Sequence, residues 1–149
     1  DPVLAGDQRA IEDAVKGLRA KCISLAKAQK KREEMEAKLK KTEARYDEVT
    51  ELLDKFSSGR GGVMSMENLK KATDERDRLF GKDIPDQRAA IEKQESKTIA
   101  KARKDVDEAA ERVHKFGKDA LPAIDRYLAD RRANGDMLDV LEDLKKRAQ

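Results

Sequence analysis

Two side chains of this protein could carry nucleophilic chemistry, the single cysteine Cys22 and the single histidine His114. A Cys–His pair gives a thiolate nucleophile when the histidine takes the thiol proton and a third group orients the histidine. The sequence offers no pattern for that third group or for an oxyanion hole. Cys22 also falls on an apolar helical stripe, which favours a small buried hydrophobe over a nucleophile.

The same two residues bear on metal and disulfide chemistry. One histidine and one distant cysteine are too few ligands for a zinc site, and a single cysteine forms no intramolecular disulfide. We therefore predict no bound metal and no cofactor. Because His114 follows the apolar Val113 directly, we expect it beside the apolar face along which two helices would pack, or on the surface.

Neighbouring carboxylates are the other pattern that could do acid–base chemistry. They occur at Glu33-Glu34, Asp107-Glu108 and Glu142-Asp143. In helices this charged, carboxylates are ordinary partners of lysine and arginine one turn away. Paired-carboxylate catalysis also needs a concave pocket, and an elongated helical hairpin offers little concavity. We predict that the chain is not an enzyme and has no small-molecule substrate.

A cluster of basic residues gives the sharpest binding signal. Residues 16–32 contain seven basic residues and no acidic one. On a helix of about 100° per residue, five of them share the face opposite the apolar stripe of Val15, Leu18 and Cys22. These five are Lys16, Arg19, Lys27, Lys30 and Lys31. The face is either a docking surface for an acidic protein or anionic lipid heads, or a solvated face partly neutralised by acids of the C-terminal helices.

A glycine-rich segment, residues 57–64, is the second candidate binding site. Loops often carry recognition, and Arg60 stands there among glycines, followed by Val63 and Met64. A phosphate cradle is not favoured, because the pattern of a P-loop and the strand before it are both missing. The segment is either a plain turn or a partner-binding tip.

Composition limits the class of protein. Charged residues make up 44% of the chain and aromatic residues 3%, which fits long solvated helices better than a compact globule. The net charge is only +3 and the basic cluster at residues 16–32 contains no aromatic residue, so nucleic-acid binding is not favoured. The sequence contains no apolar run of about 18 residues, so we predict no membrane span. Peripheral contact with a membrane remains open. The chain begins with Asp1, as a processed, soluble mature protein or an excised fragment would; its compartment is unknown.

The elements that position these residues are expected to be helices. Residues 7–56 contain no proline and one glycine, which predicts a single helix of about 50 residues and roughly 75 Å. A second arm is expected at 65–116, with Ser65 as its N-cap. Within that arm residues 80–85 should interrupt the helix, and Asp83 is the candidate cap for its continuation.

Two short helices should follow the second arm. They are expected at 119–133 and 136–148, with Asp119 and Asp136 as their N-caps. The sequence Asn134-Gly135 between them is a typical helix stop.

Folding the chain at the glycine-rich turn brings apolar residues of the two arms together, including Leu39 opposite Phe80. We therefore predict an all-α fold. It is a single elongated domain of residues 1–149, a long antiparallel helical hairpin that resembles a coiled coil. At its base the two short C-terminal helices complete a three- or four-helix bundle.

These patterns predict a non-catalytic helical accessory or scaffold protein. It would dock electrostatically on a larger acidic assembly, for example as a peripheral subunit of a membrane complex. Two alternatives stay open: a receptor- or partner-binding hairpin that acts through its glycine-rich tip, and a homo-oligomerising coiled coil. The oligomeric state is not predicted.

Overall fold

The regular structure of the chain is helical throughout the part that the computed structural model describes, residues 2–59, 62 and 64–149. The α-helices are α1 (Pro2–Ser57), α2 (Met66–Arg78), α3 (Ile84–Lys93), α4 (Ala100–His114), α5 (Leu121–Ala129) and α6 (Leu138–Ala148). Two π-helical turns, η1 (Leu79–Asp83) and η2 (Gln94–Ile99), join α2, α3 and α4, and two 3₁₀ turns, η3 (Gly117–Ala120) and η4 (Gly135–Met137), precede α5 and α6. The expected all-α class is confirmed.

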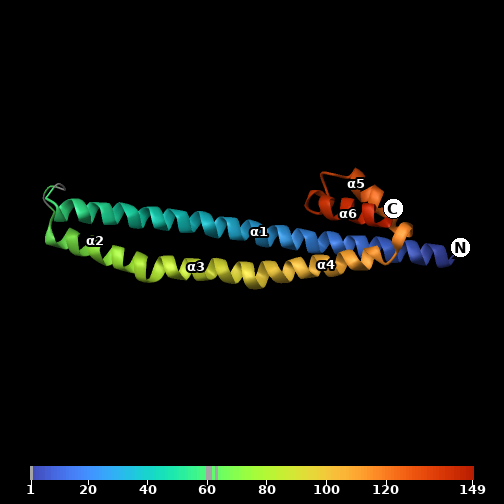
Figure 1. Cartoon of the computed structure of the whole chain (residues 1–149), viewed down its shortest axis with the longest axis horizontal. Helices are drawn as coiled ribbons and strands as arrows, with labels where there is room; N and C mark the ends of the chain where they lie inside the picture. The colour runs from blue at the N-terminus through green and yellow to red at the C-terminus, as the bar shows by residue number, and fades with distance from the viewer. Residues whose placement is uncertain (1, 60–61, 63) are drawn as a thin grey trace. The chain divides into compact units, whose positions relative to one another are not determined.

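Helix α1 is continuous from Pro2 to Ser57, as the absence of proline from residues 7–56 predicts for that segment (Figure 1). The chain forms two compact units, Asp1–Lys30 with Lys97–Gln149 and Lys31–Ser96, and α1 contributes residues to both. Across the described residues, no helix has both the length and the apolar character needed to cross a membrane.

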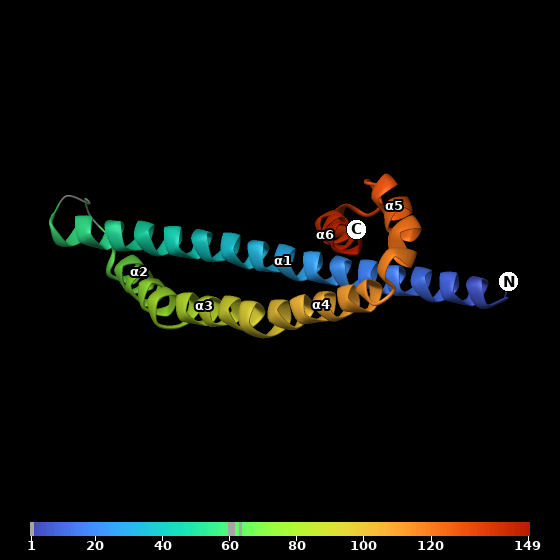
Figure 2. The ribbon, with the colours of Figure 1, turned by 45° about the vertical axis from the view of Figure 1, so that its right-hand side comes forward.

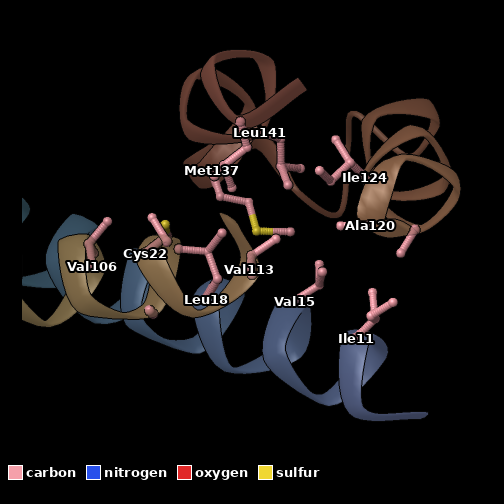
Figure 3. Packing of buried hydrophobic residues seen from close by; sticks show 14 residues of the cluster. Ile11, Val15, Leu18, Cys22, Val106, Val113, Ala120, Ile124, Met137 and Leu141 are labelled. Atoms are coloured by element: carbon pink, nitrogen blue, oxygen red, sulfur yellow. The ribbon is translucent and has the colours of Figure 1, made fainter. Parts of the chain in front are cut away.

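The core of the first unit forms where the N-terminal part of α1 meets α4, α5 and α6. Figure 3 shows Leu18 and Val113 facing Met137 and Leu141. All four side chains are at most 1% exposed, and Val15 beside them is fully buried. The apolar stripe expected on the first helix is therefore the buried face of α1, because its spacing of three and four residues keeps it on one side of the helix.

The two C-terminal helices begin differently from the prediction. Asp119 and Asp136 do not cap them with their side chains, and the two N-cap assignments are wrong. In each case a 3₁₀ turn precedes the helix and its backbone carbonyls accept the first free N–H groups: Leu121 donates to Lys118, and Met137 donates to Asn134 at 3.0 Å. Gly117, with φ of +59°, turns the chain out of α4 and starts the first of these turns.

Helix α5 ends at Ala129, before the expected end at residue 133. The side-chain amide of Asn134 donates to the carbonyls of Tyr127 and Asp130 at 3.1 and 3.0 Å, and it is only 4% exposed. Asn134 lies beyond the end of α5 and donates to two carbonyls there that the helix itself leaves free. The helix therefore ends earlier than the Asn134-Gly135 pair suggested.

In the second unit the C-terminal half of α1 runs antiparallel to α2 and α3 (Figures 1 and 2). Val49, Leu53 and Leu79 form its buried apolar cluster, and Ile84 is buried as well. Arg45 donates to both carboxylate oxygens of Glu75, at 2.5 and 3.0 Å. This hydrogen-bonded ion pair holds the pKa of the Glu75 carboxyl below its usual value.

The start of the second arm is confirmed. The Ser65 hydroxyl accepts a hydrogen bond from the N–H of Asn68 at 3.1 Å, and α2 begins at the next residue, Met66. A side-chain oxygen at this position satisfies one of the N–H groups that the first turn leaves free.

The expected interruption at residues 80–85 is wrong, and so is Asp83 as an N-cap. Asp83 has helical backbone angles, φ −63° and ψ −47°, and makes no capping hydrogen bond. The chain instead widens into the π turn η1, in which the N–H of Ile84 donates to Leu79. Pro85 lies in the first turn of α3, where its missing N–H disturbs the helix least. A local widening therefore replaces the predicted break.

Phe80 does not occupy the apolar seam opposite Leu39. Its side chain is 67% exposed and stacks on the ring of Tyr46, with ring centroids 5.8 Å apart. Beyond η1, Arg32 of α1 meets Glu95 at 3.4 Å, a pairing displaced by several residues from one that places Leu39 opposite Phe80. Each π turn contains one extra residue, which changes the side of the helix on which the later side chains lie.

Candidate docking surface

The basic residues predicted for partner binding lie on α1. In the first unit Lys16, Lys27 and Lys30 are exposed, and Lys31, the first residue of the second unit, is exposed too. Within the described part of the chain none of these four lysines makes an ion pair. Their charges are therefore directed to solvent or to a partner.

The lysines of the first unit are unevenly spaced along α1. Lys27 and Lys30 are three residues apart and are neighbours on the helix surface, about 5–6 Å between Cβ atoms. Lys16 lies 11 residues before Lys27, about 16 Å along the helix axis at about 1.5 Å per residue. That separation exceeds the screening length of about 8 Å at physiological salt. Lys27 and Lys30 form the dense part of the surface, and Lys16 lies apart from them.

Arg19 differs from the lysines. Its guanidinium is half-buried, and Nη2 donates to the carbonyl of Ala133 at 2.9 Å. Nε is buried and has no hydrogen-bond acceptor among the described residues. Arg19 thus holds α1 against the segment between α5 and α6, and this contact leaves less of its charge for a partner.

Three acids near the C-terminal helices, Asp125 of α5, Asp143 of α6 and Glu111 of α4, are paired with bases of α6. Asp125 meets Lys145 at 2.8 Å, and Arg147 meets Glu111 at 2.8 Å and Asp143 at 3.8 Å. The bond from Arg147 lowers the pKa of the Glu111 carboxyl. These carboxylates are engaged away from the lysines of α1, so they do not neutralise that surface through direct ion pairs.

Helix α4 adds basic side chains that the sequence analysis did not single out. Residues 97–104 contain four basic residues and no acidic one. Lys101 and Lys104 are exposed, and Val106 lies in the same apolar cluster as Cys22 of α1 (Figure 3). The signal that could have revealed them is the same as for α1, a run of helical residues that lacks acids.

The alternative binding site at the glycine-rich tip falls largely outside the described residues, which exclude Arg60 and Val63. Met64 is described and is half-buried. Gly59 and Gly62 have φ of +77° and +75°, which glycine adopts readily in a tight turn between two helices. The tip stays a prediction.

The two candidate nucleophilic residues lie in the first unit. Cys22 is 3% exposed, and burial, with a smaller effect from the Asp136 carboxylate, raises the pKa of its thiol to about 11. The thiol is therefore protonated at neutral pH and is a poor nucleophile. His114 is half-buried beside Val113, close to the expected position. Among the described residues, no three side chains of the His, Cys, Asp and Glu types come together as metal ligands.

Comparison of the chain with protein-family models, with curated proteins and with solved structures finds no match.

Proposed function

We propose that this chain is a non-catalytic helical accessory protein that docks on an acidic protein surface of a larger assembly. The contact is made by the lysine surface of the first unit, Lys27 and Lys30 with Lys16. The observation that supports this most is the absence of acidic partners for these three lysines within the described residues, while Arg126, Lys145 and Arg147 of the neighbouring helices are paired.

This contrast matters because pairing is easy in so charged a chain. Arg126 binds Glu12 of α1, close in sequence to Lys16, and Lys145 and Arg147 bind acids of their own unit. A clustered, unpaired cationic surface raises the local potential, speeds association with an anionic partner and selects against cationic ones. Such a surface suits electrostatic docking.

A protein partner fits this surface better than a lipid bilayer does. Helices that lie in a membrane interface bury an apolar face between the headgroups. The large apolar residues that the described chain exposes are Leu52, Met66 and Phe80, all in the second unit. Among the described side chains of the first unit, residues 7–30 and 97–149, no large apolar one is exposed beside Lys27 and Lys30, so this lysine surface offers charge without an apolar insertion surface.

Charge reversal tests the proposal. We expect the triple variant Lys16→Glu, Lys27→Glu, Lys30→Glu to retain about tenfold less of its protein partner than the unaltered chain does, because like charges then face the acidic surface. The full chain is immobilised, incubated with extract of the cells it comes from, and the retained protein is quantified over a salt series. Circular dichroism should show unchanged helicity, since all three side chains are exposed.

The matched control is Lys38→Glu, Lys40→Glu, Lys41→Glu. It makes the same change in net charge with three exposed lysines of the same helix, in the second unit. This control should retain the partner. Equal retention by both triple variants would contradict the proposal, and so would binding to vesicles of phosphatidylglycerol with no retained protein, which would assign the surface to a membrane.

A further inference from the structure

The second unit carries a pair of stacked aromatic rings, Tyr46 and Phe80. Phe80 is 67% exposed, although its ring stacks on Tyr46 with a centroid distance of 5.8 Å and an angle of 28° between the ring planes. Tyr46 is half-buried and packs against the cluster of Val49, Leu53 and Leu79. The Tyr46 ring thus packs against the core, and the Phe80 ring that stacks on it remains exposed at the surface.

The π turn η1 explains why Phe80 faces outward. Leu79 and Ile84 are both buried, at 5% and 6% exposure, although they are five residues apart rather than three or four. The widened turn accommodates the extra residue, and the N–H of Ile84 donates to Leu79 across it. Both apolar side chains can then face the core while Phe80 points away. Such turns are frequent at functional sites in helices.

A groove of about 420 Å³ opens beside the two rings. Its apolar lining consists of Tyr46, Phe80, Ile84 and Pro85. Aromatic side chains in such a position bury large areas on binding, and aromatic and arginine residues dominate the energetics of protein interfaces. Because stacking already orders Phe80, little side-chain entropy remains to be lost when a partner covers it.

The rim of this groove carries negative charge. Glu43, Asp47 and Arg88 line it. Arg88 is compensated by Glu43, 3.8 Å away, whereas Asp47 is exposed and makes no ion pair with any described residue. The rim therefore offers an unpaired carboxylate next to an apolar floor, which fits an apolar anchor with a cation beside it.

We propose that this Tyr46–Phe80 groove binds a cationic amphipathic helix of a protein partner. An aliphatic or aromatic side chain of that helix covers Phe80, and a neighbouring lysine or arginine pairs with Asp47. The groove lies within the second unit and needs a partner of opposite charge to the one that the lysine surface of the first unit would bind. The two surfaces can therefore be tested independently.

The probe is a synthetic helical peptide of leucine and lysine, with leucines three and four residues apart, and a matched peptide with glutamate in place of lysine. Binding to the full chain is followed by aromatic ¹H–¹³C spectra, which are simple because the chain has three phenylalanines and two tyrosines. We expect the lysine peptide to shift the Phe80 and Tyr46 signals and the glutamate peptide to bind about tenfold more weakly.

Two variants locate the site. Phe80→Ala and Asp47→Lys should each weaken the lysine peptide about tenfold, while the matched reversal Asp54→Lys, at an exposed acid of α1 outside the groove, should leave its affinity nearly unchanged. All three side chains are exposed, so circular dichroism should show folded protein. Unchanged affinity in Phe80→Ala, or equal binding of both peptides, would overturn the proposal. Concentration-dependent self-association that Phe80→Ala abolishes, without peptide binding, would assign the groove to a second copy of the chain instead.

Discussion

Replacing Leu18 by alanine is expected to lower the free energy of unfolding of the first unit by about 2–5 kcal/mol. Leu18 is fully buried in the cluster where α1 meets α4, α5 and α6. Removing its side chain loses the transfer free energy of the deleted carbons. It also leaves a cavity that the four surrounding helices can fill only in part. Urea unfolding followed by circular dichroism measures the change.

The matched control makes the same substitution in the same helix. Leu52 of α1 is 44% exposed, so Leu52→Ala should change the free energy of unfolding by about 0.5 kcal/mol or less. The two variants share the same change in helix propensity, and the difference between them isolates burial. Equal losses in both variants would contradict the core described for the first unit.

Replacing Asn134 by alanine is expected to cost about 1–3 kcal/mol of stability. The change removes the donors that reach the carbonyls of Tyr127 and Asp130. The Asp130 carbonyl still accepts the backbone N–H of residue 134, at 3.1 Å. The Tyr127 carbonyl, however, loses its side-chain donor, and water reaches the site poorly because residue 134 is only 4% exposed. A partly buried carbonyl without a donor carries the full cost of its desolvation.

A second substitution separates hydrogen bonding from packing at this site. Asn134→Asp keeps the size of the side chain but replaces the donor with an oxygen, so it should destabilise the chain at least as much as Asn134→Ala does. Asn68 of α2, which is exposed, provides the control, and Asn68→Ala should change stability by about 0.5 kcal/mol or less. If Asn134→Asp proved as stable as the unaltered chain, the hydrogen bonds assigned to Asn134 would be wrong.

The long helices and the core of the first unit could be predicted because the information is local and periodic. The segment after residue 7 lacks proline, and Ile11, Val15, Leu18 and Cys22 recur at three and four residues. Any helix with that spacing has one apolar face, whatever it packs against. Burial of these four side chains follows from that pattern.

The π turns could not be predicted in this way. Gly81 and Pro85 indicated a disturbance near residues 80–85, but a break and a widened turn share that local signal. Which of them forms depends on whether Leu79 and Ile84 can both reach the core, and that is a tertiary question. The exposed position of Phe80 follows from the turn, so the groove beside it was equally hidden from the sequence.

The N-cap predictions for the two C-terminal helices were wrong for a related reason. An aspartate before a helical pattern is a good N-cap, but a 3₁₀ turn can satisfy the same N–H groups from the backbone. Arg19 illustrates the limit for the docking surface. Its place on the helix suggested a free charge, and only the fold shows that Ala133 of another segment accepts its hydrogen bond.

Carbodiimide cross-linking of the assembly retained from cell extract tests the proposed docking most directly, because this reagent joins a lysine amine to a carboxylate that touches it. We expect amide links from Lys27 and Lys30, and more weakly from Lys16, to aspartate or glutamate residues of one partner protein, with mass spectrometry to identify both ends. Links to that partner confined to Lys38, Lys40 and Lys41, all exposed on the same helix, would contradict it.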